Sequence, residues 1–255
     1  MKVIILGSGT ATPSLQRNSS GLFIEADGTN ILVDMGPGTL RRMCEAGIDY
    51  KDIDIIMLTH FHPDHVVDFI SFLFASNYAY GPMRTDPFHV CGPVGLKEFH
   101  EDLIKIFGSW VIPTNDRMTM HEMSSDGPDS LEIKKLQLTS RPAAHSYPSL
   151  SYRIEADGTS LTISGDTDVS EDLAQLARKS HTLICECSLP DGMKVHGHLT
   201  PSEAGLIATR SEVERLILTH LYPPCESVDI VMDARKCFKG NVIKAEDLMT
   251  VDFDS

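Results

Sequence analysis

The segment from His60 to His65 concentrates the side chains best suited to chemistry. It runs His-Phe-His-Pro-Asp-His, so three imidazoles and one carboxylate lie within six residues. Imidazole nitrogen and carboxylate oxygen are donors that borderline divalent metals such as zinc prefer. A single histidine in such a segment would be a solvated polar residue more often than a ligand, but this grouping predicts a metal site. The candidate ligands are His60, His62, Asp64 and His65.

Three further candidates, His145, Asp166 and His220, each come just after a strand-like run. A metal site needs ligands that converge, and strands that end on one edge of a sheet bring their following residues together. Each of the three residues, taken alone, is more often a cap, a turn former or a core residue. Their order after the histidine segment predicts instead that they complete the site.

These residues need elements that deliver them to one place. The run 53–59 is apolar almost throughout and predicts a strand buried on both faces that leads into the histidine segment. Pro63 suits the first turn of a helix, which we expect to reach about Tyr80. Alternation over 131–143 predicts one strand, and the polar stretch 116–129 predicts a connection that could hold a lid.

The rest of the chain alternates between strand and helix patterns. We expect strands at 1–7, 88–91, 181–187 and 215–219, hairpins over 21–36 and 149–167, helices at 39–46, 94–107, 171–180 and 201–210, and a last helix and strand within 228–251.

Two short sequences recur in the same order. Glu-Ala-Asp-Gly-Thr occurs at 25–29 and 155–159, and Leu-Thr-His occurs at 58–60 and 218–220. Matches this short can arise by convergence at turns, but both together suggest two similar ββα halves. Because no linker or low-complexity segment separates them, we predict one domain over 1–255 in which two sheets face each other with helices outside.

Composition limits the class of protein. The 255 residues are 42% hydrophobic and 23% charged, which is ordinary for a soluble globular chain. No apolar run is long enough to span a bilayer, and the amino terminus reads as a first strand rather than a signal peptide, so we expect a cytoplasmic protein without membrane association. The six cysteines lack zinc-finger spacing, and in a chain of this size we expect them to be reduced thiols.

The formal net charge of −14 bears on possible partners. A strongly negative surface repels a phosphate backbone at long range, which argues against general binding of nucleic acid, although a local basic patch would be compatible with it. We expect a small-molecule or short nucleotide substrate. A homodimer is the assembly we expect, because it is the commonest closed one.

The motif order resembles that of the metallo-β-lactamase superfamily: Leu-Thr-His-Phe-His-Pro-Asp-His, a lone histidine, an aspartate in a Gly-Asp-Thr turn and a final Leu-Thr-His. The resemblance covers nearly the whole chain and implies an α/β fold, the four-layer αββα sandwich. It also implies two divalent metal ions, usually Zn²⁺, with Mn²⁺ or iron in some members. One ion would be held by His60, His62 and His145, the second by Asp64, His65 and His220, with Asp166 bridging both.

Such a metal pair would supply hydroxide near neutral pH and stabilise negative charge on the substrate, which implies a hydrolase. Asp64 is a candidate for orienting the hydroxide. Asp34, after the run Ile-Leu-Val, is a candidate hydrogen-bond partner for a ligand histidine, with a turn cap as the alternative.

The segment from Val195 to Gly205 indicates a particular branch of the superfamily. Its His198-Leu-Thr, followed by a helix with Glu-Ala-Gly, resembles the RNase Z and phosphodiesterase branch of the superfamily. There the matching histidine assists phosphodiester cleavage, and Glu186 matches a glutamate that pairs with it and would keep it protonated. His196 is expected to be a solvated loop residue.

One departure from that branch concerns the substrate. tRNA 3′-processing members carry a long basic arm, in many bacterial members inserted between the lone histidine and the Gly-Asp-Thr aspartate, whereas only 21 positions separate His145 from Asp166. The sequence therefore favours a phosphodiesterase acting on a small or exposed phosphodiester. The alternatives are tRNA 3′ processing without the arm, hydrolysis of an arylsulfate, lactone or thioester on the same metal site, and a non-catalytic scaffold.

Overall fold

The computed structural model describes residues 1–78, 80–81, 83–156 and 158–253. Its strands form two seven-stranded sheets. The first sheet has the order β14-β1-β2-β3-β4-β5-β6 and contains β1 (Lys2–Gly7), β2 (Gly21–Ala26), β3 (Thr29–Val33), β4 (Ile55–Met57), β5 (Phe88–Pro93), β6 (Met118–Met123) and β14 (Thr250–Asp252).

The second sheet has the order β13-β12-β11-β10-β9-β8-β7. It contains β7 (Asp129–Ile133), β8 (Leu136–Pro142), β9 (Leu150–Ala156), β10 (Thr159–Ile163), β11 (Thr182–Glu186), β12 (Arg215–Thr219) and β13 (Asn241–Lys244).

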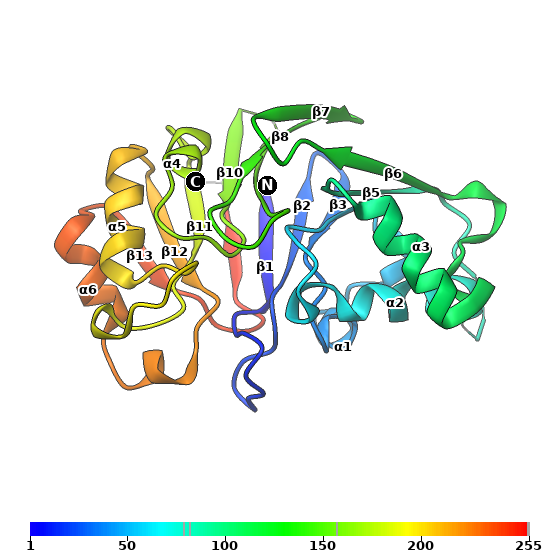
Figure 1. Cartoon of the computed structure of the whole chain (residues 1–255), viewed down its shortest axis with the longest axis horizontal. Coiled ribbons are helices and arrows are strands. Elements are labelled where there is room, and N and C mark those ends of the chain that lie inside the picture. Colours follow the sequence, from blue (N-terminus) through cyan, green and yellow to red (C-terminus); the bar gives the residue numbers. More distant parts are fainter. Residues whose placement is uncertain (79, 82, 157, 254–255) are drawn as a thin grey trace.

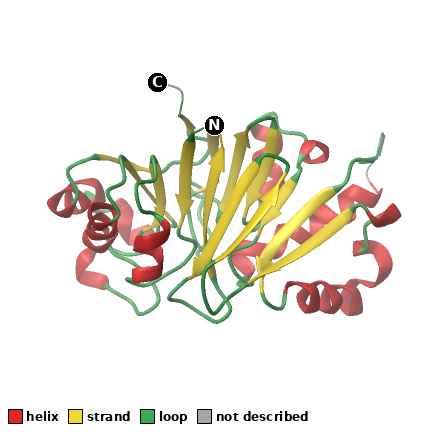
Figure 2. Cartoon of the chain, turned by 90° about the horizontal axis from the view of Figure 1, so that it is seen from above, coloured by secondary structure: helices red, strands yellow, loops and turns green. Residues whose placement is uncertain are grey.

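Helices cover the outer face of each sheet. In Figure 1, α1 (Thr39–Glu45), α2 (Pro63–Tyr78) and α3 (Leu96–Phe107) lie on the side of the first sheet, and α4 (Glu171–Leu176), α5 (Pro201–Arg210) and α6 (Ile230–Cys237) lie on the side of the second. Figure 2 shows the strands enclosed between helices on both sides. The predicted four-layer αββα sandwich is therefore confirmed.

Three hydrophobic clusters hold these layers together. The central cluster fills the space between the sheets and includes Ile5, Ile24 and Tyr152. A second cluster packs the first sheet against α1, α2 and α3, and a third packs the second sheet against α4, α5 and α6. Because strands such as β4 bury both faces, they read as continuous apolar runs rather than as alternating patterns.

Each half contains an antiparallel hairpin next to parallel strands. The repeated pentapeptide lies at the turn of β2–β3 and again at the turn of β9–β10, although Asp157 is outside the described residues. Both hairpins continue into parallel neighbours, β4 and β11. The organisation as one domain of two similar halves stays a prediction.

Three sequence expectations are wrong. The run 131–143 is not one strand but the hairpin β7–β8, because Lys134 adopts a left-handed φ of 55° and turns the chain. The polar stretch 116–129 contains β6, which pairs along its whole length with β5 while Met118 and Met120 pack against the helix-side cluster. The end of the chain holds two strands, β13 and β14, one at an edge of each sheet.

Other boundaries differ by a few residues. The strand expected at 53–59 is restricted to β4, and the helix expected at 171–180 ends at Leu176. The helix expected to reach Tyr80 is α2, which is assigned to Tyr78 and is followed by the undescribed residue 79. Within the described part of the chain, no helix is both long and apolar enough to cross a membrane.

Candidate metal centre

The histidine segment connects the end of β4 to the start of α2. Leu58 and Thr59 continue the buried run beyond β4, and Pro63 begins the helix, where its missing N–H costs no hydrogen bond. The first helical turn then carries Asp64 and His65, both buried. One sharp loop therefore delivers the four candidates of this segment to the edge of the first sheet.

The other three candidates come from the facing edge of the second sheet. His145 follows β8, Asp166 follows β10 and His220 follows β12. His220 has a φ of 56°, an uncommon backbone conformation for a residue with a side chain. Strands that are distant in sequence thus end at one place between the two sheets.

The seven side chains form two groups. Ligand atoms of His60, His62, His145 and Asp166 lie within 4.8 Å of one another, and so do those of Asp64, His65 and His220. The sequence prediction that these residues come together is confirmed. Their role as ligands stays a prediction.

Asp166 lies between the two groups and directs one oxygen toward each. Its Oδ2 is 3.9 Å from Nε2 of His60 and 3.8 Å from Nε2 of His145. Its Oδ1 is 3.3 Å from Nε2 of His65 and 3.3 Å from Nε2 of His220. Two ligand atoms that share a tetrahedral zinc ion at about 2.1 Å each are separated by roughly 3.4 Å, so these spacings suit shared ions.

The buried polar atoms at the centre fit a cation. Within the described residues, Nε2 of His60, Nε2 of His65, Nε2 of His220 and Oδ1 of Asp166 are buried without a hydrogen-bond partner. Leaving such atoms unpaired is costly, and native structures satisfy nearly all of them. Three imidazole Nε2 atoms and a carboxylate oxygen that face one another are the donor set of a zinc-type site.

Nδ1 of His60, His65, His145 and His220 each has a hydrogen-bond partner, which fixes the orientation of the ring. The partners are Thr59 Oγ1 for His60 at 3.0 Å, Asp34 Oδ2 for His65 at 2.7 Å, Gly197 O for His145 at 2.9 Å and Ser188 Oγ for His220 at 3.0 Å. A hydrogen bond at Nδ1 favours a tautomer whose Nε2 lone pair is free for a metal. Asp34 therefore has the contact predicted for it.

Electrostatics also favour a cation. Burial lowers the pKa of His60 to about 2, helped by the neighbouring histidines, so its imidazole is neutral at pH 7. Burial raises the pKa of Asp166, but His220 and His65 outweigh this and hold it well below its usual range. The centre therefore offers an ionised carboxylate beside a neutral imidazole.

His198 lies next to this centre, held by Glu186. Nδ1 of His198 is 2.9 Å from Oε1 of Glu186, and the His198 ring centroid is 5.0 Å from that of His145. A ring nitrogen of His198 also falls within 4.8 Å of ligand atoms of Asp166 and His220. Burial lowers the pKa of His198, and the hydrogen bond and charge of Glu186 outweigh it, so the pKa lies above its ordinary value.

Glu186 is a fully engaged buried carboxylate. It is 1% exposed and accepts the backbone N–H groups of Thr167, Ser188 and Leu199 in addition to His198. These bonds involve both carboxylate oxygens and fix the position of the side chain. The glutamate can therefore hold the imidazole in one orientation.

Sequence reasoning missed Ser188. Its hydroxyl contacts Glu186 Oε2 at 2.8 Å, Nδ1 of His198 at 3.2 Å and Nδ1 of His220 at 3.0 Å. Ser188 is two residues beyond Glu186, where β11 ends, and this spacing was the available signal. The predicted solvated residue His196 is indeed exposed.

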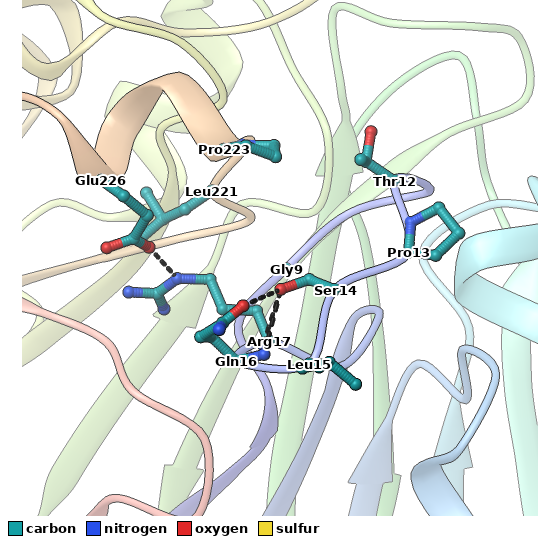
Figure 3. A pocket seen from close by; sticks show the side chains of 10 residues that line it. All are labelled: Gly9, Thr12, Pro13, Ser14, Leu15, Gln16, Arg17, Leu221, Pro223 and Glu226. Carbon is teal, nitrogen blue, oxygen red and sulfur yellow. Dashed lines mark hydrogen bonds and ion pairs between the residues drawn. The ribbon is translucent and has the colours of Figure 1, made fainter.

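A cavity of about 600 Å³ lies away from the candidate ligands, none of which is among the described residues that line it. Figure 3 shows its walls: the loop that carries Thr12 and Leu15 lies on one side, and Leu221 and Pro223 lie on the other. Arg17 reaches across to Glu226, with Nε 2.5 Å from Oε1, and closes one end. A separate cavity, lined by Asp166, Glu186 and His220 among others, has a volume of about 20 Å³.

Comparison with known proteins agrees with this geometry. Residues 29–221 match the family model described as "Beta-lactamase superfamily domain". The chain belongs to the beta-lactamase superfamily. The expectation of a metal-dependent hydrolase with this fold is confirmed at the level of that family.

Among curated members of the superfamily, the chain is similar to a protein named Ribonuclease Z from Methanothermobacter thermautotrophicus, with 27% identity over 99% of this chain and 96% of the relative. It is also similar to a protein of the same name from Mycobacterium bovis, with 29% identity over 88% of this chain and 86% of the relative. These likenesses confirm the predicted resemblance to the RNase Z branch.

Solved structures share the fold over nearly their full length. A metallo-β-lactamase fold protein from Bacillus subtilis, YhfI, has a TM-score of 0.82 at 19% identity and covers 98% of both chains. The short form of human tRNase Z has a TM-score of 0.82 at 24% identity and covers 100% of both chains. A diphosphatase of the PhnP family has a TM-score of 0.68 at 18% identity, over 99% of this chain and 98% of its own.

Proposed function

We propose that this superfamily member is a phosphodiesterase that uses two divalent metal ions. His60, His62 and His145 would hold one ion, Asp64, His65 and His220 the other, and Asp166 would contact both through its two oxygens. Zn²⁺ suits the donors, and Mn²⁺ or iron is compatible with them. When bound, the ions supply a hydroxide near neutral pH and stabilise charge on the phosphoryl oxygens.

The observation that carries this proposal is the contact between His198 and Glu186 at the edge of the metal centre. With Nδ1 engaged by Glu186, the other ring nitrogen of His198 is free to give a proton to the oxygen that leaves phosphorus. Phosphodiesters with alkoxide leaving groups require such a proton. A hydrolase for already good leaving groups would gain little from this pair.

Asp64 has a separate role in the proposal. Its Oδ2 is 3.5 Å from Nε2 of His220 and 3.7 Å from Nε2 of His65, and burial is outweighed by these histidines, so its pKa falls to about 2. The carboxylate is therefore ionised at pH 7. It can bind metal through one oxygen and accept a hydrogen bond from the attacking water through the other.

The proposed substrate is a small or exposed phosphodiester, such as a cyclic nucleotide or the end of a short oligonucleotide. The net charge of −14 disfavours a long polyanion held by the protein surface. Location in the cytoplasm and assembly as a homodimer stay predictions.

The test compares turnover of bis-p-nitrophenyl phosphate, a 2′,3′-cyclic nucleotide and a precursor tRNA by the metal-loaded wild type and His198→Ala. We expect turnover of the small diesters and, in the variant, loss of cyclic nucleotide hydrolysis. Inactivity of the wild type on all three substrates would overturn the proposal. A panel of arylsulfates, lactones and thioesters would then identify the bond cleaved.

Cleavage of precursor tRNA at its 3′ end is the second candidate, because the curated relatives are named Ribonuclease Z. The alignment with the Methanothermobacter protein runs over 304 positions, so at least 49 of them have no counterpart among the 255 residues of this chain. We infer that this chain lacks surface that the longer relative has. Specific 3′ cleavage of the tRNA in the same assay would favour this candidate instead.

A further inference from the structure

Lys194 makes three ionic or polar contacts beside the proposed centre. Its Nζ lies 2.7 Å from Oδ1 of Asp168, 2.7 Å from Oε2 of Glu203 and 2.6 Å from the backbone oxygen of His198. The Lys194 side chain is only 32% exposed, whereas that of a simple surface lysine such as Lys105 is 71% exposed. The ammonium thus contacts acceptors on the loop after β10, on α5 and on its own loop, 188–199.

Each of these acceptors belongs to a segment that carries part of the site. Asp168 comes two residues after Asp166, in the loop that follows β10. Glu203 forms the capping box at the start of α5 with Thr200. The third acceptor is the main chain of His198 itself.

Gly197 connects this network to the metal centre. Its N–H donates to Oδ2 of Asp168 at 3.0 Å, and its carbonyl accepts from Nδ1 of His145 at 2.9 Å. A Cβ atom at this position would lie 3.1 Å from His145 Nδ1, and the φ of 85° also favours glycine. The backbone of Asp168 in turn donates to the oxygen of Ala144, next to His145. Asp168 therefore links the loops of His145, Asp166 and His198.

From these contacts we propose that Lys194 is a positioning residue for the reaction. By binding Asp168, Glu203 and the carbonyl of His198, it holds the loop 188–199 in place. In that position Gly197 orients His145, and His198 faces the leaving oxygen. The inference about His198 rests on the proposed function. The inference about His145 rests on geometry alone.

The charge of Lys194 matters because it offsets two carboxylates at once. Without it, Asp168 and Glu203 would lack their shared counter-ion, and the carbonyl of His198 would lose its donor. The segment His196-Gly197-His198 would then be held less firmly in its position. A displacement of about 1 Å is enough to impair proton transfer, because general acid catalysis needs hydrogen-bond distance.

The test uses Lys194→Met, Lys194→Arg and the control Lys105→Met, which removes an exposed ion pair with Asp102 on α3. Each protein is assayed at saturating zinc on two diesters. Bis-p-nitrophenyl phosphate has a leaving group that departs as an anion, and a 2′,3′-cyclic nucleotide has one that needs a proton. Zinc affinity is measured separately by competition with a chelating dye, and melting temperatures are recorded.

We expect Lys194→Met to lower kcat on the cyclic nucleotide at least about tenfold more than on bis-p-nitrophenyl phosphate. We expect its zinc affinity to fall about tenfold, the lower end of the effect of losing a ligand's hydrogen-bond partner. Lys194→Arg should recover part of both losses, and Lys105→Met should match the wild type.

Equal loss on both substrates together with a lowered melting temperature would overturn the proposal, since that is what general destabilisation produces. Unchanged kinetics and unchanged zinc affinity would overturn it as well. If the wild type cleaves neither diester, the proposed function fails. The zinc affinity of Lys194→Met then decides whether Lys194 orients His145, and an unchanged value rejects it.

Discussion

Nδ1 of His198 lies 2.9 Å from Oε1 of Glu186, and the glutamate is buried while the histidine is partly accessible. The carboxylate thus fixes one side of the imidazole and leaves the other side for chemistry. This relationship separates the proposed proton donor from four candidate ligands, His60, His65, His145 and His220, whose Nε2 atoms face Asp166.

His198→Ala is expected to lower kcat on a 2′,3′-cyclic nucleotide by about 10²- to 10⁴-fold, the usual contribution of a general acid. Turnover of bis-p-nitrophenyl phosphate should fall much less, because its leaving group needs no proton. The control is His196→Ala, which removes an exposed imidazole two residues away and should leave both rates unchanged. Equal losses for the two substrates in His198→Ala would contradict the assignment.

The pH dependence should reveal the same group. Burial lowers the pKa of His198, but the hydrogen bond and charge of Glu186 raise it by more. The His198 imidazole therefore stays protonated to a higher pH than an ordinary histidine does. Cyclic nucleotide hydrolysis should therefore hold at lower pH and decline as pH rises through this raised pKa. Rate profiles of wild type and His198→Ala provide the check. An alkaline decline that survives unchanged in the variant would assign it to another group.

Removal of metal should destabilise the fold as well as abolish activity. A ligand at a hundredfold excess over its Kd stabilises the folded state by about 2.7 kcal/mol per site. Nε2 of His60, His65 and His220 and Oδ1 of Asp166 have no hydrogen-bond partner within the described residues. We expect dialysis against a chelator to lower Tm by several degrees, and zinc to restore it. Elemental analysis of reloaded protein should find two ions per chain. An unchanged Tm after verified metal removal would count against a resident metal centre.

Asp34→Ala tests the support of two candidate ligands, His65 directly and His60 through the hydroxyl of Thr59. Asp34 accepts from Nδ1 of His65 at 2.7 Å and from the backbone N–H of Thr59 at 2.8 Å, both buried contacts. Loss of such a partner costs about 10- to 100-fold in metal affinity. Chelator competition should show this decrease, whereas Asp172→Ala, which breaks a more exposed pair with Arg141, should show none.

Gly205→Ala tests the packing behind the His198 segment. A Cβ at Gly205 would overlap the backbone carbonyl oxygen of Ala234, where α5 and α6 approach closely. Overpacking of this kind costs about 1–3 kcal/mol, and the backbone of α6 cannot rotate away as a side chain could. Thermal unfolding should show a lowered Tm. Gly192→Ala is the matched control, because no described atom lies within 4 Å of its Cβ position.

Local sequence determined the identity of the candidate ligands and most of the elements that carry them. The sequence predicted His60, Asp64, His145 and His220 as candidate ligands from their types and order, because only a few kinds of side chain can bind a metal ion. The sequence also predicted strands such as β4 and β12 and helix α5, because apolar runs, prolines and capping residues act on a few neighbouring positions.

Only the tertiary structure decided how these pieces meet. In the structure the run 131–143, predicted as one strand, is a hairpin that turns at Lys134, and the polar stretch before it contains strand β6. Pairing with a neighbouring strand overrides a weak local pattern. The two oxygens of Asp166 face different histidines, and Lys194 bridges Asp168 and Glu203, through contacts between residues far apart in the chain. Such contacts depend on how two sheets pack face to face, and no pattern within a short window of sequence contains that information.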